Sequence, residues 1–287
     1  AVDEWQRPFC SLGTVRRVAL DCSLALEHLH ALGIVHTDLK MENSLRRPGC
    51  HHPFEPGVCV PDRPSTACFT IVDFGGATSV SPTSSSIVCT RQYRPPEVTL
   101  RLGWREPVDV WSLACVLAEL WTTDLLFRTH DEVEHLALIE RLLGALPEDM
   151  LLASAELRMG AEKYTEDGAL RWPELALNRA SVERVRAQPR LRDAIAKPGY
   201  GCRRQCCRYL FNTLSAMLEY RPVDRVMARN VPDLFLHVCD YCRNLSDVFS
   251  EHAESYFAVG RGQKGAPAMS GGRAGRRGVV ECGRGRA

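Results

Sequence analysis

Four polar residues in two short stretches of the sequence could together act on a phosphate group. Asp38 lies two residues before Lys40, so both side chains point to the same side of an extended loop, and Asn43 follows. Asp73 comes thirty residues after Asn43. A carboxylate can accept a proton from a hydroxyl, a lysine can neutralise phosphate charge, and amide and carboxylate oxygens suit Mg²⁺. These residue types therefore suit phosphoryl transfer, in which a protein mainly positions groups and neutralises charge.

Taken singly, each of these residues is typical of a polar turn exposed to solvent. Their order along the chain favours chemistry instead. Four motifs follow one another: His36-Thr37-Asp38-Leu39-Lys40-Met41-Glu42-Asn43, Asp73-Phe74-Gly75, Pro95-Pro96-Glu97 and Asp109-Val110-Trp111-Ser112. This succession resembles the catalytic loop, the metal-binding turn and the end of the activation segment of a protein kinase, with a helix after them.

The resemblance implies ATP and Mg²⁺ as cofactors and a role for each polar residue. Asp38 would accept the proton of the substrate hydroxyl, Lys40 would hold the γ-phosphate, and Thr90 would brace both side chains. These three are the predicted catalytic residues. The predicted cofactor-binding residues are Lys40, Asn43, Leu45 as the floor under adenine, and Asp73, of which Asn43 and Asp73 are the predicted metal ligands.

Three features narrow the resemblance to the LAMMER-type, Clk-like dual-specificity kinases of the CMGC group. His-Thr-Asp replaces the commoner His-Arg-Asp at residues 36–38, and residues 134–144 resemble the signature EHLAMMERILG. A long gap before the metal-binding turn contains an insertion at residues 48–66. The resemblance covers roughly residues 5–240 and implies protein substrates such as Arg/Ser-rich splicing factors.

Thr37 carries a consequence for regulation. Kinases with arginine at this position often use it to bind a phosphate on the activation segment, which orders that segment. Because threonine cannot form this ion pair, we expect activity not to depend on such a phosphate. Four other positions depart from the family pattern without removing a chemical group: Met41, Ser44, Gly76 and Pro95.

The resemblance also implies the domain organisation. The catalytic loop begins at His36, whereas a complete kinase domain has a β-rich lobe before it, with a Gly-rich loop and a strand lysine. We therefore expect an α+β protein-kinase-like fold represented mainly by its helical C-terminal lobe, from a fragment or a truncated product. Within a kinase domain at 1–247 we expect a family-type insertion at 48–66, an activation segment at 73–97 and an extended insert region at 128–200. Residues 248–287 are the expected tail.

The apolar pattern predicts the elements that position these motifs. Residues 14–32 place apolar side chains at helical spacing and stop near Gly33, which predicts an amphipathic helix before the catalytic loop. Ile71-Val72 predicts a short strand. The nearly all-apolar run 108–120 predicts a buried helix that is too short and too polar to cross a membrane.

Side-chain partners or environments can be predicted for three sets of residues. Asp109 would either hydrogen-bond the backbone of the catalytic loop or cap its own helix, and both roles are compatible. Glu97 and Arg225 match family positions that form a buried ion pair. His36 and Phe74 match the stacked positions that join the two lobes, and we expect both to be partly exposed when the partner lobe is lacking.

The chain has 13 cysteines and no N-terminal signal peptide, which favours free thiols in a reducing intracellular compartment, nuclear or cytoplasmic. Zinc is a weak alternative for three loosely spaced groups of residues. These groups are Cys239 with Cys242, then Cys202, Cys206 and Cys207, and finally Cys50, His51, His52 and Cys59.

The end of the chain differs in composition from the rest. Residues 260–287 hold six arginines and Lys264 against Glu281, a net charge of +6, whereas the whole chain carries only +1. We expect this Arg/Gly-rich tail to be disordered. It could contact RNA through its charge, but it has no aromatic residue to stack on bases, and a passive tail is the alternative.

Two functions remain open from the sequence. The first is a protein serine/threonine or dual-specificity kinase, for which Glu42 could face a substrate arginine or could simply be a solvated carboxylate. The second is an inactive kinase-lobe fragment that acts as an interaction module. An upstream Gly-rich loop and strand lysine would distinguish the first function from the second.

Overall fold

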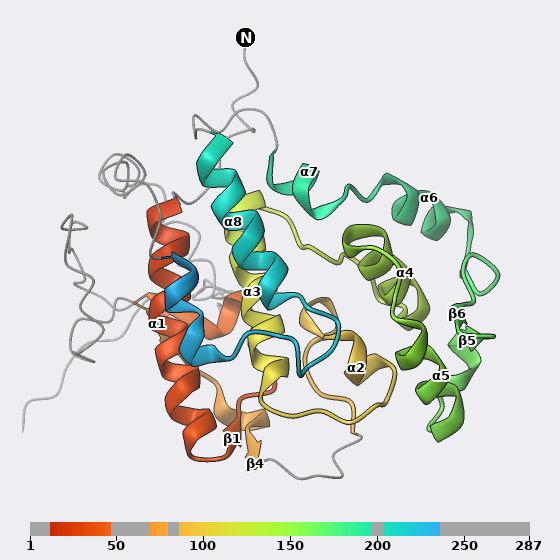
Figure 1. Cartoon of the computed structure of the whole chain (residues 1–287), viewed down its shortest axis with the longest axis horizontal. Helices are drawn as coiled ribbons and strands as arrows, with labels where there is room; N and C mark the ends of the chain where they lie inside the picture. Colours follow the sequence, from red (N-terminus) through yellow and green to blue (C-terminus); the bar gives the residue numbers. More distant parts are fainter. Residues whose placement is uncertain (1–11, 47–68, 80–85, 197–203, 236–287) are drawn as a thin grey trace, which may run out of the picture.

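The computed structural model of the chain describes residues 12–46, 69–79, 86–196 and 204–235. The helix α3 (Pro107–Thr122) lies at its centre and packs against α1 (Leu12–Ala31) and α8 (Arg204–Met217), as Figure 1 shows. The helices α4 to α7 lie on the other side of α3 from α1. The described part is mainly helical with short strands, which confirms the predicted fold class.

The helix α1 forms because its apolar residues repeat on one face. Val15, Val18, Cys22 and Leu26 are each at most 1% exposed, so this face lies in the main core. The helix ends before Gly33, whose φ of +70° is the left-handed conformation that glycine adopts readily at helix ends. The helix predicted at 14–32 is confirmed and begins two residues earlier.

The helix α3 is buried along most of its length. Every residue from Val108 to Ala118 is buried, as expected for a helix that is apolar all round. Pro107 stands at the first helical position, where its missing N–H costs nothing. The helix predicted at 108–120 is therefore confirmed, and it gives the rest of the lobe a rigid centre.

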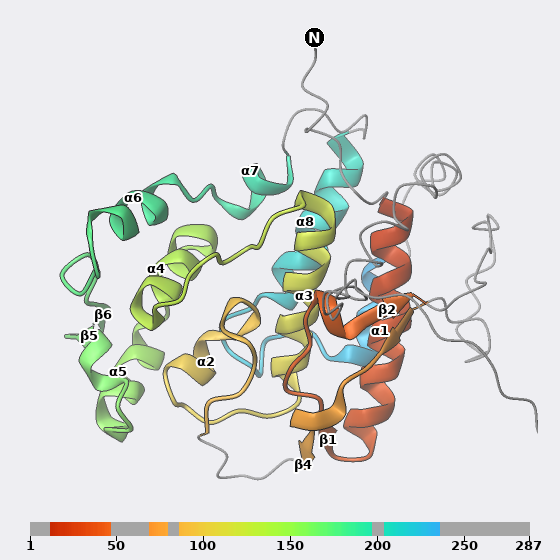
Figure 2. The ribbon, with the colours of Figure 1, turned by 180° about the vertical axis from the view of Figure 1, so that it is seen from behind.

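The strands form three small antiparallel pairs. β1 (Ile34–Val35) pairs with β4 (Thr78–Ser79), β2 (Ser44–Arg46) with β3 (Phe69–Ile71), and β5 (Thr165–Glu166) with β6 (Ala169–Leu170). Figure 2 shows that the first two pairs lie beside α1, which contacts β1 and β3. The strand predicted at Ile71-Val72 is present as β3, but it begins two residues earlier and ends at Ile71. The Val72 N–H donates to the Asn43 carbonyl at 2.9 Å, next in line with the Ser44–Ile71 pair.

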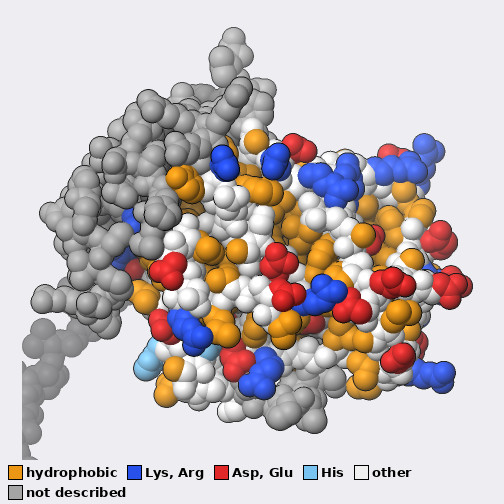
Figure 3. Space-filling model, viewed as in Figure 1, with side chains coloured by type: hydrophobic (Ala, Val, Ile, Leu, Met, Phe, Trp, Pro, Cys, Tyr) orange, Lys and Arg blue, Asp and Glu red, His pale blue; other side chains and the backbone are white. Residues whose placement is uncertain are grey.

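The region from 128 to 196 forms a layer of helices and one hairpin. Its helices are α4 (Glu132–Leu143), α5 (Glu148–Leu157), α6 (Arg179–Ala187) and α7 (Leu191–Ile195), with β5 and β6 between α5 and α6. Asp131 caps α4, since its Oδ1 accepts from the Glu134 N–H at 2.8 Å. Figure 3 shows arginine side chains gathered over α6 and α7.

A buried ion pair joins two distant parts of the lobe. Arg225 donates from Nη1 and Nη2 to the two carboxylate oxygens of Glu97 on α2 (Pro96–Thr99), at 2.7 and 3.0 Å. Glu97 is 1% exposed and Arg225 is 3% exposed. The predicted pair is confirmed. It fixes the end of the activation segment to the chain that follows α8, which then forms two short 3-10 helices, Ala228–Asn230 and Pro232–Phe235, against α1.

Several predictions concern residues outside the described ranges. They include the insertion at 48–66, the tail at 248–287 and nearly all of the cysteine and histidine groups considered for zinc. Among the described residues, no three His, Cys, Asp or Glu side chains are grouped to hold a metal ion. In the same residues no helix is both long and apolar enough to cross a membrane.

Candidate active site

Asp109 of α3 holds the loop that carries the candidate residues. Its carboxylate is fully buried and accepts from the backbone N–H groups of His36 at 2.8 Å and Thr37 at 2.9 Å. The ring of His30 on α1 lies 3.0 Å from the same carboxylate. The predicted contact with the loop backbone is confirmed. The first residue of α3 is preceded by Glu106, so Asp109 is not the capping residue of its helix.

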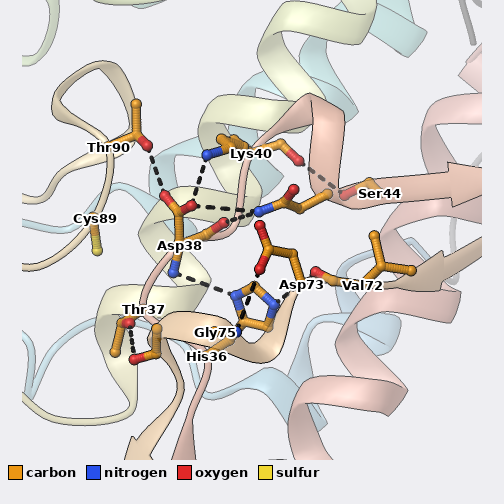
Figure 4. A network of polar contacts seen from close by, with 12 residues as sticks. His36, Thr37, Asp38, Lys40, Ser44, Val72, Asp73, Gly75, Cys89 and Thr90 are labelled. Atoms are coloured by element: carbon orange, nitrogen blue, oxygen red, sulfur yellow. Dashed lines mark hydrogen bonds and ion pairs between the residues drawn. The ribbon is translucent and has the colours of Figure 1, made fainter. Parts of the chain in front are cut away.

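Asp38 lies at the centre of the polar network in Figure 4. Its Oδ1 accepts from the Thr90 hydroxyl at 2.6 Å, and its Oδ2 lies 2.6 Å from Lys40 Nζ. Burial on its own raises the pKa of Asp38, but the hydrogen bonds from Lys40 and Thr90 outweigh it and hold the pKa below its usual value. Asp38 is therefore ionised at neutral pH and can accept a proton.

Asn43 and Asp73 supply the oxygen atoms that the predicted metal site needs. The Asn43 side-chain amide donates to the Asp38 carbonyl at 2.8 Å, which leaves the amide oxygen as the group that can act as a ligand. Asp73 is exposed and has a φ of +66°, and its Oδ1 accepts from the Gly75 N–H at 3.3 Å. An amide oxygen and a free carboxylate oxygen fit Mg²⁺ in type.

Thr37 connects the catalytic loop to both ends of the activation segment. Its hydroxyl donates to the Gly76 carbonyl at 2.7 Å, and its carbonyl accepts from the Cys89 N–H at 2.8 Å. Thr37 has a φ of +67°, which for a β-branched residue costs on the order of 1–3 kcal/mol. A Cβ at Gly76 would lie 3.0 Å from the Thr37 hydroxyl, so the glycine leaves room for this contact.

The expectation that His36 is partly exposed is wrong. His36 is fully buried, because its Nε2 lies 3.1 Å from the Val72 carbonyl and its Nδ1 accepts from the Asp38 N–H at 3.3 Å. Phe74 is 49% exposed, as expected, and packs edge-on against the His36 ring with centroids 5.2 Å apart. The His36 ring is therefore buried between its own loop and the segment that follows β3.

Leu45, the predicted floor under adenine, follows Asn43 closely and lies on β2. Its side chain is 42% exposed. An apolar side chain open to solvent beside polar phosphate-binding candidates fits a surface that a flat apolar ring could cover. Its role, like the roles of the other candidate residues, stays a prediction.

Sequence reasoning missed Arg94, which organises the segment after Thr90. Its Nε donates to the Val88 carbonyl at 3.0 Å, and its Nη2 donates to the Cys89 carbonyl at 2.9 Å. These bonds hold the backbone that presents Thr90 to Asp38. Arg94 directly precedes the motif Pro95-Pro96-Glu97, but nothing local in the sequence indicates which carbonyls it reaches.

Comparison with known proteins agrees with this geometry. The protein kinase domain family matches residues 4–231, so the chain belongs to the protein kinase family. Its curated relatives place it with the LAMMER-type, Clk-like kinases, as the sequence motifs predicted. It is 35% identical over 223 residues to the serine/threonine-protein kinase AFC2 of Arabidopsis thaliana, covering 75% of this chain and 51% of that protein.

Other relatives are similar to a comparable degree. The dual specificity protein kinase CLK1 of Homo sapiens is 35% identical over 220 residues, covering 76% of this chain and 43% of that protein. The crystal structure of a kinase domain superposes with a TM-score of 0.60 at 30% identity, over 79% of this chain and 70% of that one. The chain spans about half the length of the curated relatives it matches most strongly.

Proposed function

We propose that this chain supplies the catalytic loop of an ATP-dependent serine/threonine or dual-specificity protein kinase. The observation that carries the proposal is the position of the Asp38 carboxylate, which accepts hydrogen bonds from Thr90 and Lys40. Asp38 would accept the proton of a substrate hydroxyl, while Lys40 would neutralise charge on the transferred phosphoryl group. Asn43 and Asp73 would hold Mg²⁺, which when bound neutralises the phosphates of ATP.

Replacing the proposed base tests this function. In the protein made from its full coding region, Asp38→Asn should lower the turnover of a peptide substrate roughly 10²–10⁴-fold, because the amide cannot accept the proton. The assay is the transfer of labelled phosphate from ATP. Asp149→Asn, which makes the same change at an exposed carboxylate paired with Arg221, is the matched control and should keep full activity. Unchanged turnover in Asp38→Asn would refute the assignment.

We further propose that the substrates are basic, of the Arg/Ser-rich kind. Glu42 is exposed next to the candidate site, and Glu119 lies close enough to be affected by its charge. Burial raises the pKa of Glu119, and the neighbouring carboxylates of Glu42 and Asp124 raise it further. Because these carboxylates repel one another, a substrate arginine placed beside them would relieve the repulsion.

Reversing the charge of Glu42 distinguishes a carboxylate that binds a substrate arginine from one that is only solvated. Glu42→Lys should raise the KM for an Arg-Ser peptide by roughly fivefold or more and leave the KM for a neutral serine peptide nearly unchanged. Peptide phosphorylation measured over a range of peptide concentrations gives both constants. Equal effects on the two peptides would show that Glu42 does not recognise substrate charge.

We propose a reducing intracellular location, nuclear or cytoplasmic. It is supported by the four free cysteines in the described ranges, of which Cys22, Cys89 and Cys115 are buried. Fluorescence microscopy of the tagged whole protein tests it, and a secreted protein would contradict it. RNA contact by the tail at 248–287 stays a separate prediction, to be tested by RNA binding with and without those residues.

A further inference from the structure

A groove lies where the end of α4, the start of α7 and the end of α8 meet. Its volume of about 410 Å³ falls within the roughly 300–1,000 Å³ that is typical of ligand-binding pockets. Each of the three helices contributes apolar side chains to its walls. These are Leu142 and Leu143 from α4, Leu191 from α7, and Phe211 from α8 with Leu218 just after it. None of the described residues that line the groove belongs to the candidate active site.

Hydrogen bonds hold the walls of the groove in place. The indole Nε1 of Trp121 on α3 donates to the Ile195 carbonyl at the end of α7, at 3.1 Å. The Tyr220 hydroxyl, after α8, donates to the Gly144 carbonyl, after α4, at 2.6 Å. Because these bonds fix the walls to the lobe and to one another, the groove is formed before a ligand binds. A groove that is already formed lowers the entropy cost of binding.

Two arginines at the groove have no carboxylate partner among the described residues. Arg190 and Arg192 are both exposed and stand on either side of the buried Leu191. Arg190 Nη1 donates to the Glu140 carbonyl at 3.4 Å. The guanidinium of Arg192 lies 5.3 Å from the centre of the Phe211 ring. Since each guanidinium carries five N–H donors, most of these donors are available to an anion above the groove.

The charge around the groove is mainly positive. From the start of α6 to the end of α7, residues 179–195 hold five arginines against two acidic residues, a net charge of +3 (Figure 3). Glu219 is the one carboxylate among the described residues that line the groove. The nearby Glu140 carboxylate accepts from the Leu146 N–H at 3.0 Å. A ligand with negative charge therefore suits this surface.

We propose that this groove binds an acidic segment of a partner protein that carries one or two large apolar side chains, such as leucine or phenylalanine. The apolar side chains enter the groove against Leu143 and Phe211, and the acidic residues pair with Arg190 and Arg192. Burial of the apolar side chains provides affinity, and the charges select an acidic segment over a neutral one. This inference does not rest on the proposed function, since binding at the groove requires no phosphoryl transfer.

The arrangement of the charges favours a protein segment over a small amphiphile. The arginines are not confined to the groove but continue from α7 along α6. A small amphiphile with one anionic group reaches only the arginines at the groove. An extended peptide places its residues roughly 3.3 Å apart, so its carboxylates can meet several arginines in succession.

The test is the binding of three short fluorescein-labelled peptides to the full chain, measured by fluorescence anisotropy. The acidic apolar peptide has two glutamates followed by leucine and phenylalanine. The neutral peptide has glutamine in place of both glutamates, and the alanine peptide has alanine in place of the leucine and the phenylalanine. The acidic apolar peptide should bind at least about fivefold more tightly than either of the others, because each of them lacks one of the two contributions.

Three variants locate the binding. Arg190→Gln should weaken binding of the acidic apolar peptide about threefold or more and leave that of the neutral peptide nearly unchanged. Glu219→Gln removes the carboxylate that repels the peptide and should tighten binding about twofold, a gain that cannot come from loss of folded protein. Arg105→Gln removes an exposed arginine that is paired with Glu106 before α3, and this matched control should bind as the wild type does.

Equal binding of the acidic apolar and alanine peptides would overturn the proposal, because a charged surface alone would then explain it. Equal binding of the acidic apolar and neutral peptides would overturn the role of the arginines. Equal effects of Arg190→Gln and Arg105→Gln, or no gain in Glu219→Gln, would place the binding outside the groove. Competition by decanoate at the same concentration as unlabelled peptide would identify a small amphiphile as the occupant and overturn the protein segment.

Discussion

His135 on α4 combines complete burial with a titratable ring. Neither ring nitrogen has a hydrogen-bond partner among the residues that the structure describes, and the ring lies 5.3 Å from that of Phe127. Burial and the charges of Arg94 and Arg91 lower its pKa to about 3. His135 is therefore neutral in the folded protein over most of the pH range in which the unfolded chain would protonate it.

This difference predicts a loss of stability in acid. Between pH 6.5 and 3 the unfolded state binds a proton at His135 that the folded state does not, so the free energy of unfolding falls as pH falls. His135 should contribute a slope of about 1.4 kcal/mol per pH unit in this range. Urea unfolding at several pH values measures it.

His135→Leu should flatten the pH dependence without losing a hydrogen bond, because the ring makes none to the described residues. His28→Leu, at an exposed position of α1, is the control and should keep the wild-type slope. An unchanged slope in His135→Leu would assign the acid sensitivity to other groups.

At the scale of elements, the Glu97–Arg225 pair joins α2 to the chain after α8. Arg225→Met should lower the free energy of unfolding by about 3–5 kcal/mol, because it leaves the Glu97 carboxylate buried without its partner. Chemical denaturation gives this value. Arg221→Met removes an exposed arginine paired with Asp149 and should have no measurable effect. Equal losses in the two variants would contradict the importance of burial.

The elements show what a sequence can predict. α1 and α3 were predictable because their apolar spacing is local and strong, and the Glu97–Arg225 pair followed from family resemblance. The exact bounds of β3 were not, since they depend on its pairing with β2, which lies more than twenty residues earlier in the chain. The buried His36 and the link from Tyr164 to Glu132 likewise depend on segments that only the fold brings together.

At the scale of the whole molecule, the activation segment is anchored at both ends without a phosphate. β4 pairs with β1 at its start, and Thr37 bonds the backbone of Gly76 and Cys89 near its two ends. We therefore expect the complete kinase to stay active when every serine and threonine from residue 79 to residue 86 is replaced.

The variant that tests this carries alanine at Ser79, Ser81, Thr83, Ser84, Ser85 and Ser86. Its turnover should stay within about threefold of wild type, since the hydrogen bonds from Thr37 are intact. Phosphate transfer to a peptide is the assay. Thr37→Val, which keeps the shape but removes the hydroxyl, should lower turnover in the same assay. Abolished activity in the alanine variant would refute phosphate independence.

The ion pair between Glu97 and Arg225 also sets an order of events during synthesis. Its partners are 128 positions apart in the chain. A ribosome adding about 5–20 residues per second needs roughly 6–26 s to pass from one to the other. Until Arg225 has been made, the Glu97 carboxylate has no partner and must stay hydrated. The segment that presents Thr90 to Asp38 therefore cannot yet be fixed to the chain that follows α8. The nascent lobe therefore completes its catalytic surface only after nearly all of its described residues have been made.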